Sequence, residues 1–353
     1  SVVVALPFQL PNVPFSGLPH DTYDAHLIAQ QRLFDPSLGP RAEAERANLA
    51  VNEARVRTNI YALHNDVNDA FFSAALAEAR ANELTTVIGD LETQLRLAQA
   101  RVREGTALPS ESATIQAELL QRRQDRDDLA TTRGASLAIL SSLTGRQIDA
   151  NDTSLLPDLA PAVARARVSI PRARPEYTEF ARAREQLAAQ ERVVAAQARP
   201  QVSAYGRLGY GKPGLNFLST DFNSYWIAGV HVQWAPWTWG SNARDREVLE
   251  VQQQIVASDE EAFTAATQRT VERQLAEIDR LTAALRTDES IIALRERIER
   301  ETQRRYTEAV VTAAEYVDRS NDVLAARLTR VSHEVELAQA RARYLTTVGL
   351  EPR

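Results

Sequence analysis

The 353-residue chain contains no cysteine and no methionine, and its only lysine is Lys212. The absence of cysteine excludes disulfides, thiolate metal sites, a cysteine nucleophile and a lipid anchor on a cysteine within this chain. A chain without methionine does not begin at a native start codon, so we expect a mature or trimmed form. Ser1 to Leu6 is apolar but lacks the charged start and the cleavage site of a signal peptide.

Long apolar runs, aromatic residues and excess basic charge are also scarce. No segment reaches the roughly 18 apolar residues of a transmembrane helix. Only 6% of the residues are aromatic, and the formal net charge is -6. An acidic chain without a basic stripe argues against nucleic acid as a partner. Abundant alanine, leucine, arginine, glutamate and glutamine indicate long helices rather than a compact enzyme fold.

The prolines leave two long gaps, from Pro40 to Pro109 and from Pro236 to Pro352. Since a proline inside a helix costs about 3 kcal/mol, long helices fit best in these gaps. Apolar residues recur there in steps of three and four, which is typical of helices with coiled-coil character. In the first gap they include Val56, Ile60, Leu63, Val67, Phe71, Ile88, Leu91, Leu95, Ala98 and Val102, and in the second Val271, Leu275, Ile278 and Leu285. A helix from Arg41 to Arg103 would be roughly 95 Å long, so we expect it to lie against other long helices.

The sequence repeats itself at an offset of about 204 residues. This self-similarity predicts one supersecondary unit used twice. The matching pieces are Arg101–Gly105 with Arg305–Ala309, Glu111 with Glu315, and Leu143–Gly145 with Thr347–Gly349.

The repeat predicts the organisation of the chain. A first copy would cover residues 1–146, with strands at about 1–34 and a helical hairpin at about 38–145. Residues 147–172 would be a polar, proline-bearing linker. A second copy would cover residues 173–353, with a helix at 175–198, strands at 201–236 and a helical hairpin at 241–349.

The first copy has a plain turn signal between its two helices. Glu104 to Ser110 contains a glycine and a proline, and Ser110 is a favourable N-cap residue for the second helix. Moved by the offset, this turn predicts a second turn near Glu308 to Ala313, in a stretch with neither proline nor glycine. We further expect the last helix to pair with a helix that precedes Ser1.

Three segments alternate between apolar and polar residues, as β-strands do. Their apolar faces are Tyr23, Ala25, Leu27 and Ala29 in the first, Val202, Ala204, Gly206, Leu208 and Tyr210 in the second, and Trp226, Ala228, Val230, Val232 and Trp234 in the third. This alternation is typical of membrane β-barrel strands, and equally of an ordinary antiparallel sheet on a soluble core.

Four tryptophans favour the membrane interpretation: Trp226, Trp234, Trp237 and Trp239. They lie at the ends of predicted strands, where a membrane–water interface places this side chain. Four strands at most cannot close a barrel, so a barrel requires several copies of the chain.

Several pieces of the sequence together resemble the TolC family of outer membrane efflux proteins. The pieces are Arg174–Glu176 at the start of a helix, Arg199–Ser203 at the start of a strand, Trp234–Gly240 after a strand, Arg103–Gly105 at the first turn and Val310–Asp318 at the second. Together with the duplication, the resemblance covers the chain from about Tyr23 to Gly349.

The resemblance implies a homotrimeric duct with a mainly α fold and a small β part. Four strands per subunit would form a shared β-barrel in the lipid of a Gram-negative outer membrane. The long antiparallel helices would form an α-helical barrel, the periplasmic tunnel, with an equatorial region built partly from the linker. Such a protein is a passive conduit for efflux or type I secretion, without a catalytic centre, a metal or a cofactor. It works with a periplasmic adaptor protein and an inner-membrane pump.

The resemblance also implies an entrance at the helical turns. Its acidic residues would be Glu315 and Asp318, which in three copies would form a cation-attracting ring. Glu315 has a second interpretation, because Thr312-x-x-Glu315 is a capping box that stabilises the start of a helix.

The turn residues are the candidates for contact with an adaptor. They are Gly105, Thr106, Ala309, Val310 and Val311. Two of them depart from the family, since Ala309 stands where glycine is usual and Val311 where some members have an arginine that ties the closed state together.

Other patterns do not predict a site. The five histidines show no metal-ligand spacing, and we expect His26 and His231 to be polar residues that face a lumen. Gly206-x-x-Gly209-x-Gly211 lies within a predicted strand, which argues against a phosphate-binding loop. Two alternatives to a channel stay open: a periplasmic adaptor, which should have one helical hairpin with lipoyl-like and barrel halves, and a soluble coiled-coil scaffold.

Overall fold

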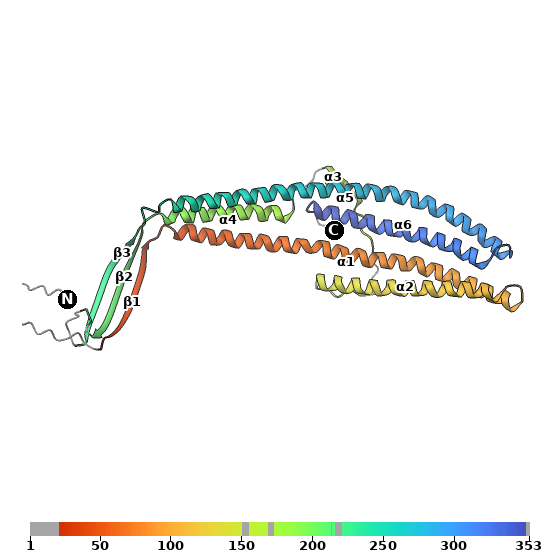
Figure 1. Ribbon diagram of the computed structural model, residues 1–353, viewed down its shortest axis with the longest axis horizontal. Coiled ribbons are helices and arrows are strands. Elements are labelled where there is room, and N and C mark those ends of the chain that lie inside the picture. Colours follow the sequence, from red (N-terminus) through yellow and green to blue (C-terminus); the bar gives the residue numbers. More distant parts are fainter. Residues whose placement is uncertain (1–20, 150–154, 169–172, 213, 216–220, 351–353) are drawn as a thin grey trace, which may run out of the picture. The chain divides into compact units, whose positions relative to one another are not determined.

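The computed structural model describes residues 21–149, 155–168, 173–212, 214–215 and 221–350. Most of these residues are helical, and three strands form a small sheet (Figure 1). The expected mainly α fold with a small β part is therefore confirmed. The strand expected within residues 1–20 lies outside the described residues.

Two helical hairpins contain most of the chain. The first consists of α1 (Leu38–Arg103) and α2 (Pro109–Thr144), and the second of α5 (Ser241–Thr307) and α6 (Ala313–Thr347). The long helices have 66 and 67 residues, and the shorter ones 36 and 35. The second turn lies between Thr307 and Ala313, where the offset predicts it.

The two turns contain the same pair of backbone hydrogen bonds. In the first, the N–H groups of Gly105 and Thr106 donate to the carbonyls three and five residues before them, at 3.1 and 2.9 Å. In the second, Ala309 and Val310 do the same, at 3.1 and 2.8 Å. This is the Schellman motif, which ends a helix with a residue in the left-handed conformation. Gly105 has a φ of 75° and Ala309 a φ of 59°.

The starts of the shorter helices differ from each other. The N-cap of α2 is Leu108, so the prediction of Ser110 as N-cap is wrong. Pro109 takes the first helical position, where its missing N–H costs nothing and its fixed φ suits a helix, and the helix therefore begins before Ser110. At α6, Thr312 Oγ1 accepts from Glu315 N–H at 3.3 Å, as the capping-box interpretation predicts.

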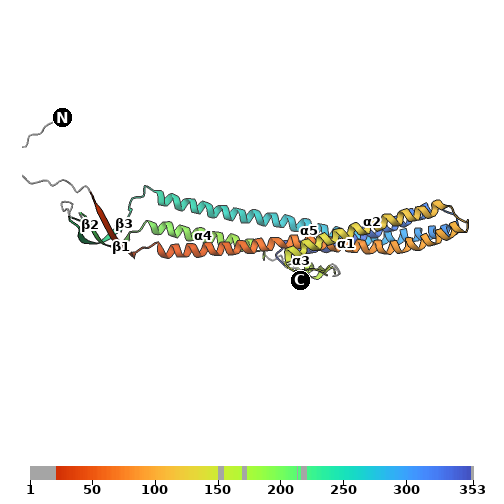
Figure 2. The same ribbon diagram turned by 90° about the horizontal axis from the view of Figure 1, so that it is seen from below.

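The chain divides into two compact units, and the sheet belongs to the first. This unit also holds the beginnings of α1 and α5 and most of α4 (Pro175–Gln197). Gln186 of α4 donates to Asn48 of α1 at 3.1 Å, and Arg246 of α5 pairs with Glu191 of α4 at 2.7 Å. α4 therefore lies between the two long helices (Figures 1 and 2).

The second unit has its core between α1, α5, α6 and α3 (Ala160–Val168). α3 lies within the segment that was expected to be a polar linker, and Val163 and Ala166 on it are buried. Its sequence signal is an alanine-rich run after Asp158, whose carboxylate accepts from Ala160 N–H at 3.1 Å. A second apolar cluster fills the end of the unit near the turns and includes Leu84, Leu91, Ile115, Leu119, Tyr316 and Leu324.

The sheet is antiparallel, with the order β1 (Tyr23–Phe34), β2 (Gln201–Lys212), β3 (Asn223–Gln233). Its register places the predicted apolar faces on one side, since Leu27, Leu208 and Trp226 form one row across the three strands. The predicted polar residues share the other side. The rows there are His26–Gly209–Tyr225, Ile28–Arg207–Ile227 and Gln30–Tyr205–Gly229.

Exchange of glycine and alanine at the two turns should change their stability in opposite directions. A left-handed conformation costs a residue with a Cβ about 1–2 kcal/mol. No atom lies within 4 Å of a Cβ added at Gly105, so Gly105→Ala should destabilise its turn through the backbone alone, by about 1 kcal/mol. Ala309→Gly should stabilise the other turn by less, because glycine also gains freedom in the unfolded chain.

Hydrogen exchange of the Thr106 and Val310 amides, which donate the long bond of each turn, measures this difference. The Thr106 amide should exchange faster in Gly105→Ala, and the Val310 amide slower in Ala309→Gly. Exchange at the wild-type rate in both variants would show that the left-handed residues do not limit turn stability.

Candidate functional site

Both helical turns lie at the same end of the second unit (Figures 1 and 2). Arg101, near the end of α1, joins them. Its guanidinium donates to Thr307 O at 2.7 Å and to Tyr306 O at 3.3 Å, and its Cζ lies 5.4 Å from the centre of the Tyr306 ring. A cation is favourable at these carbonyls because they end α5, where the helix dipole is negative. The first hairpin thus holds the end of the long helix of the second.

Two stacked tyrosines occupy the interior of this end. The rings of Tyr306 on α5 and Tyr316 on α6 are 5.5 Å apart and nearly parallel, at 9°. Burial, with additional effects of Glu299 and Asp90, raises the pKa of Tyr316 to about 12. Burial also raises the pKa of Tyr306, and Glu111 adds to this rise. Both side chains therefore remain neutral at physiological pH.

Glu299 of α5 is a half-buried carboxyl group beside Tyr316. Burial raises its pKa, Asp90 and Glu296 raise it further, and Ser320 and Arg327 oppose the rise. Its neighbour Glu296 behaves differently, because Arg327 donates to it at 2.6 Å and holds its pKa below the ordinary value. Glu296 is thus paired with a cation, whereas ionisation of Glu299 is disfavoured by its burial.

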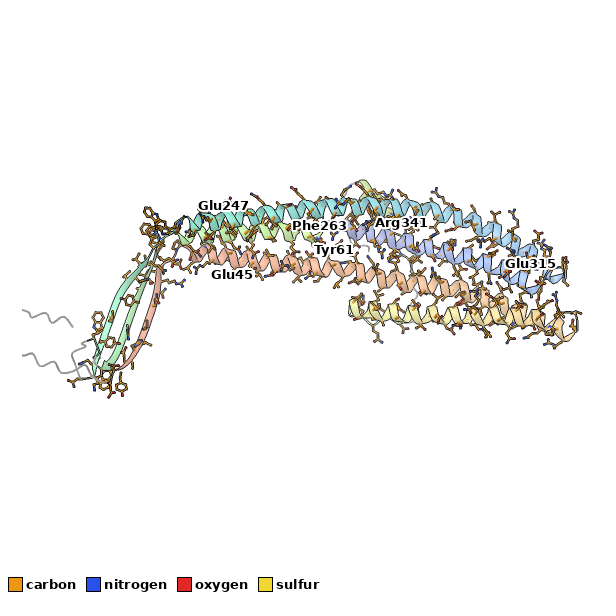
Figure 3. All side chains as sticks on the ribbon, in the orientation of Figure 1. Glu45, Tyr61, Glu247, Phe263, Glu315 and Arg341 are labelled. Carbon is orange, nitrogen blue, oxygen red and sulfur yellow. The ribbon has the colours of Figure 1, made fainter. Side chains whose placement is uncertain are left out.

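The predicted entrance residues are exposed at the beginning of α6. Glu315, labelled in Figure 3, and Asp318 lie three residues apart and thus on one face of the helix.

The predicted contact residues of the turns are mostly accessible as well. Gly105, Thr106, Ala309 and Val310 are exposed, whereas Val311 packs against the second apolar cluster. Leu108 is exposed beside them, so the turns present apolar surface that another protein can cover. Arg101 and the stacked tyrosines were not predicted. Their positions beside the turns follow from the repeat, but Arg101 connects the two hairpins, whereas the two tyrosines stack within the second.

The second candidate site is the sheet, whose apolar face is exposed. Leu27 and Trp226 each retain 73% of their surface, and Leu208 retains 62%. A contiguous exposed apolar face of this kind marks a surface that meets another protein or lipid.

Aromatic side chains lie near both ends of this face. Tyr23 and Tyr210 both stack on Phe222 beside the β2–β3 connection, at 6.3 and 5.5 Å. Trp226 is on β3, and the other three tryptophans follow the strand. The Trp234 indole donates to Ala198 O at 3.2 Å. The sequence pattern does not predict this cluster, because Phe222 lies outside the alternating segments.

Trp239 combines an unusual backbone conformation with a highly exposed side chain. Its φ is 49°, which is rare for a bulky residue, and 89% of its surface is accessible. The cost of this conformation has no matching gain in packing within the described residues.

The glycines of the sheet have a steric role. A Cβ on Gly209 would lie 2.3 Å from Tyr225 Cζ, and one on Gly229 would lie 2.8 Å from Tyr205 Oη. Each glycine therefore makes room for a tyrosine of the neighbouring strand. The glycine pattern of β2 lies in a strand, as expected. A Cβ on Gly209 or Gly211 would clash with a neighbouring strand, whereas Gly206 has open space beside it.

Two further observations concern the described residues alone. Within them, no group of three or more histidine, aspartate or glutamate side chains could hold a metal ion. None of the helices that they form combines the length and apolar character needed to cross a membrane.

Glu299→Gln should stabilise the turn end of the second unit at neutral pH. The folded-state pKa of Glu299 is raised above its unfolded value, so ionisation opposes folding, and stability is gained as pH falls through the folded pKa. The glutamine variant removes this effect and should show a smaller gain on acidification. Unfolding midpoints of both proteins between neutral pH and about pH 5 test this. Glu296→Gln is the matched control and should destabilise, because it removes an ionised partner of Arg327.

The fold is shared with solved outer-membrane channels. CusC, described as forming a transmembrane channel, superposes on 93% of this chain and over 78% of its own length, with a TM-score of 0.73 and 16% sequence identity. The open-state MtrE outer membrane channel of Neisseria gonorrhoeae matches 95% over 81% of its own, with a TM-score of 0.68 and 16% identity. The outer membrane protein VceC of Vibrio cholerae matches 94% over 87% of its own, with a TM-score of 0.69 and 13% identity. No family model and no curated relative matches the sequence. The chain therefore has the fold of the TolC-type outer-membrane channels that its sequence resembles.

Proposed function

We propose that the protein is one subunit of a homotrimeric outer-membrane channel, a passive conduit for efflux or type I secretion in a Gram-negative bacterium. The proposal rests on the two-faced sheet, in which an exposed apolar side opposes a polar side. The fold shared with outer-membrane channels supports it. An adaptor with a single hairpin does not account for two hairpins preceded by strands, and a soluble scaffold does not account for the exposed apolar face.

The apolar face of the sheet meets lipid and the polar face lines the lumen. The 11 residues of β3, at about 3.4 Å per residue and a tilt near 40°, span about 29 Å, enough to cross the ~25 Å apolar band of outer-membrane barrels. Trp226, Trp234, Trp237 and Trp239 then lie near lipid head groups. Contact with lipid would offset the backbone cost of the exposed Trp239.

Three copies of the chain form the channel. A sheet of three described strands leaves two unpaired edges, which other subunits would cover. On α5, Ile291, Leu294 and Ile298 form an exposed apolar stripe at helical spacing, which suits a helix of a neighbouring subunit.

Each subunit consists of two structural repeats, residues 1–146 and 173–353, joined by residues 147–172. The matching Schellman turns support this division. The shorter helices also end alike, on Gly145 and Gly349 in the left-handed conformation, at φ 66° and 87°.

The turns form the periplasmic entrance, with Glu315 and Asp318 as its cation-attracting residues. A periplasmic adaptor, coupled to an inner-membrane pump, contacts Gly105, Thr106, Ala309, Val310 and Val311. The exposed apolar surface of Leu108 and Val310 supports such a contact.

Leu27→Arg should prevent insertion into the outer membrane. Leu27 is exposed to 73% in the chain, so in a water-soluble protein the substitution would be nearly neutral. On the lipid side of a barrel, an arginine is destabilising, by up to about 2–4 kcal/mol at the midplane and by less toward the head groups. Gln30→Arg, on the polar face of the same strand, is the matched control and should insert normally. Membrane fractionation and gel analysis of trimers measure both variants, and normal insertion of Leu27→Arg would refute the membrane assignment of this face.

Glu315→Gln with Asp318→Asn should lower the cation selectivity of the channel several-fold in planar bilayers. Both substitutions keep size and polarity, and the Thr312 cap uses the Glu315 backbone N–H, so helix capping is retained. Glu247→Gln on α5 is the control, since it removes an exposed carboxylate far from the turn in sequence. Selectivity equal to that of the wild type in the double variant would remove both residues from the constriction.

A further inference from the structure

A polar cluster joins the three strands near the β2–β3 connection. It consists of Asp24 and His26 on β1, Arg207 on β2 and Tyr225 on β3, all on the polar face. The Tyr225 hydroxyl donates to Asp24 at 2.5 Å, and Arg207 forms an ion pair with the same carboxylate. The Arg207 Cζ lies 5.6 Å from the centre of the Tyr225 ring. Asp24 is therefore the common acceptor of a cluster that spans the sheet.

His26 contacts two members of this cluster through a single nitrogen. Its Nδ1 is 3.0 Å from Asp24 Oδ2 and 2.9 Å from Arg207 Nη2. An unprotonated Nδ1 can accept from Arg207 but cannot donate to Asp24. An imidazolium, protonated at both Nδ1 and Nε2, donates from Nδ1 to Asp24 and places a positive charge against the guanidinium. Protonation of the imidazole therefore exchanges one hydrogen bond for the other.

The charge of the cluster changes with this exchange. The charged and titratable groups that face His26 among the described residues are Asp24 on its own strand, Arg207 on β2 and Tyr225 on β3. With a neutral imidazole, the charges of Asp24 and Arg207 cancel. With a charged imidazole, the cluster gains one positive charge, and histidine is the side chain that ordinarily makes this change between about pH 5 and 8. About a third of each of the His26 and Arg207 side chains is accessible, so ions in solution can reach these charges.

We propose that this cluster is a proton-dependent ion-selectivity element in the wall of the channel. Near neutral pH, Arg207 bridges Asp24 and His26 and the cluster has no net charge. On acidification His26 binds Asp24, the guanidinium is repelled toward the lumen, and three positive charges form a ring that favours anions. The inference rests on the proposed function, which makes the polar face of the sheet the lumen wall.

Ion selectivity of the full chain in planar bilayers tests this proposal. Reversal potentials in a salt gradient should shift toward anions between about pH 7.5 and 5.5 in the wild type. His26→Gln keeps a polar side chain that cannot gain charge, and it should abolish the shift. His231→Gln, which removes a histidine from the same face of β3, should keep it. A shift that persists in His26→Gln, or one that disappears in His231→Gln, would overturn the assignment.

A second measurement does not depend on conductance. Nitrogen-15 NMR of labelled histidine, with His26→Gln for assignment, reports whether Nδ1 bears a proton. We expect His26 Nδ1 to be unprotonated at neutral pH and protonated on acidification. A proton on Nδ1 at neutral pH would overturn the exchange of bonds. A wild-type protein without any conductance would count against the proposed channel, while the NMR result would still decide the behaviour of the cluster.

Discussion

A helix of 66 residues requires a partner along its length, because its apolar stripe cannot remain in water. The chain provides partners by reversing direction at two turns, each with a left-handed residue, Gly105 or Ala309. In the second unit this brings residues from both hairpins into shared apolar clusters, for example Leu91 of α1 with Tyr316 of α6. The packing of the long helices therefore depends on two short backbone motifs.

Polar groups inside the same packing are paired across helices. Asp288 of α5 is buried and lies 2.6 Å from His333 of α6, and Arg80 of α1 donates to Ser332 of α6 at 2.8 Å. A buried charge without a partner would cost several kcal/mol, so such pairs favour one alignment of neighbouring helices over a slipped one. Glu299 is the exception, since burial raises its pKa despite the nearby Arg327. The turn end of the second unit thus combines tight packing with a carboxyl group that disfavours its charged state.

The sheet differs from the helical packing, because its apolar face is not covered. In a soluble domain, the apolar face of a sheet packs on a core, but Leu27 and Trp226 have most of their surface exposed. On the other face, tyrosines fill the space over Gly209 and Gly229, and Asp24, His26 and Arg207 interact across strands. One side is therefore organised by steric fit and charge, and the other is apolar and uncovered, as expected for a wall between lipid and water.

The periodicity of the sequence determined which segments are helices and strands, because proline gaps, three–four spacing and strict alternation are local properties. The repeat determined the second turn near Ala309, although no glycine or proline marks it. Local signals gave the wrong start for α2, because Pro109 begins the helix before Ser110. They also missed α3 in the linker, where Val163 and Ala166 are buried in the core of the second unit. Only the tertiary structure decided which distant residues meet: Arg101 with the end of α5, and His26 with Arg207. Such contacts depend on how helices and strands distant in sequence align, and periodicity within one segment carries no information about that alignment.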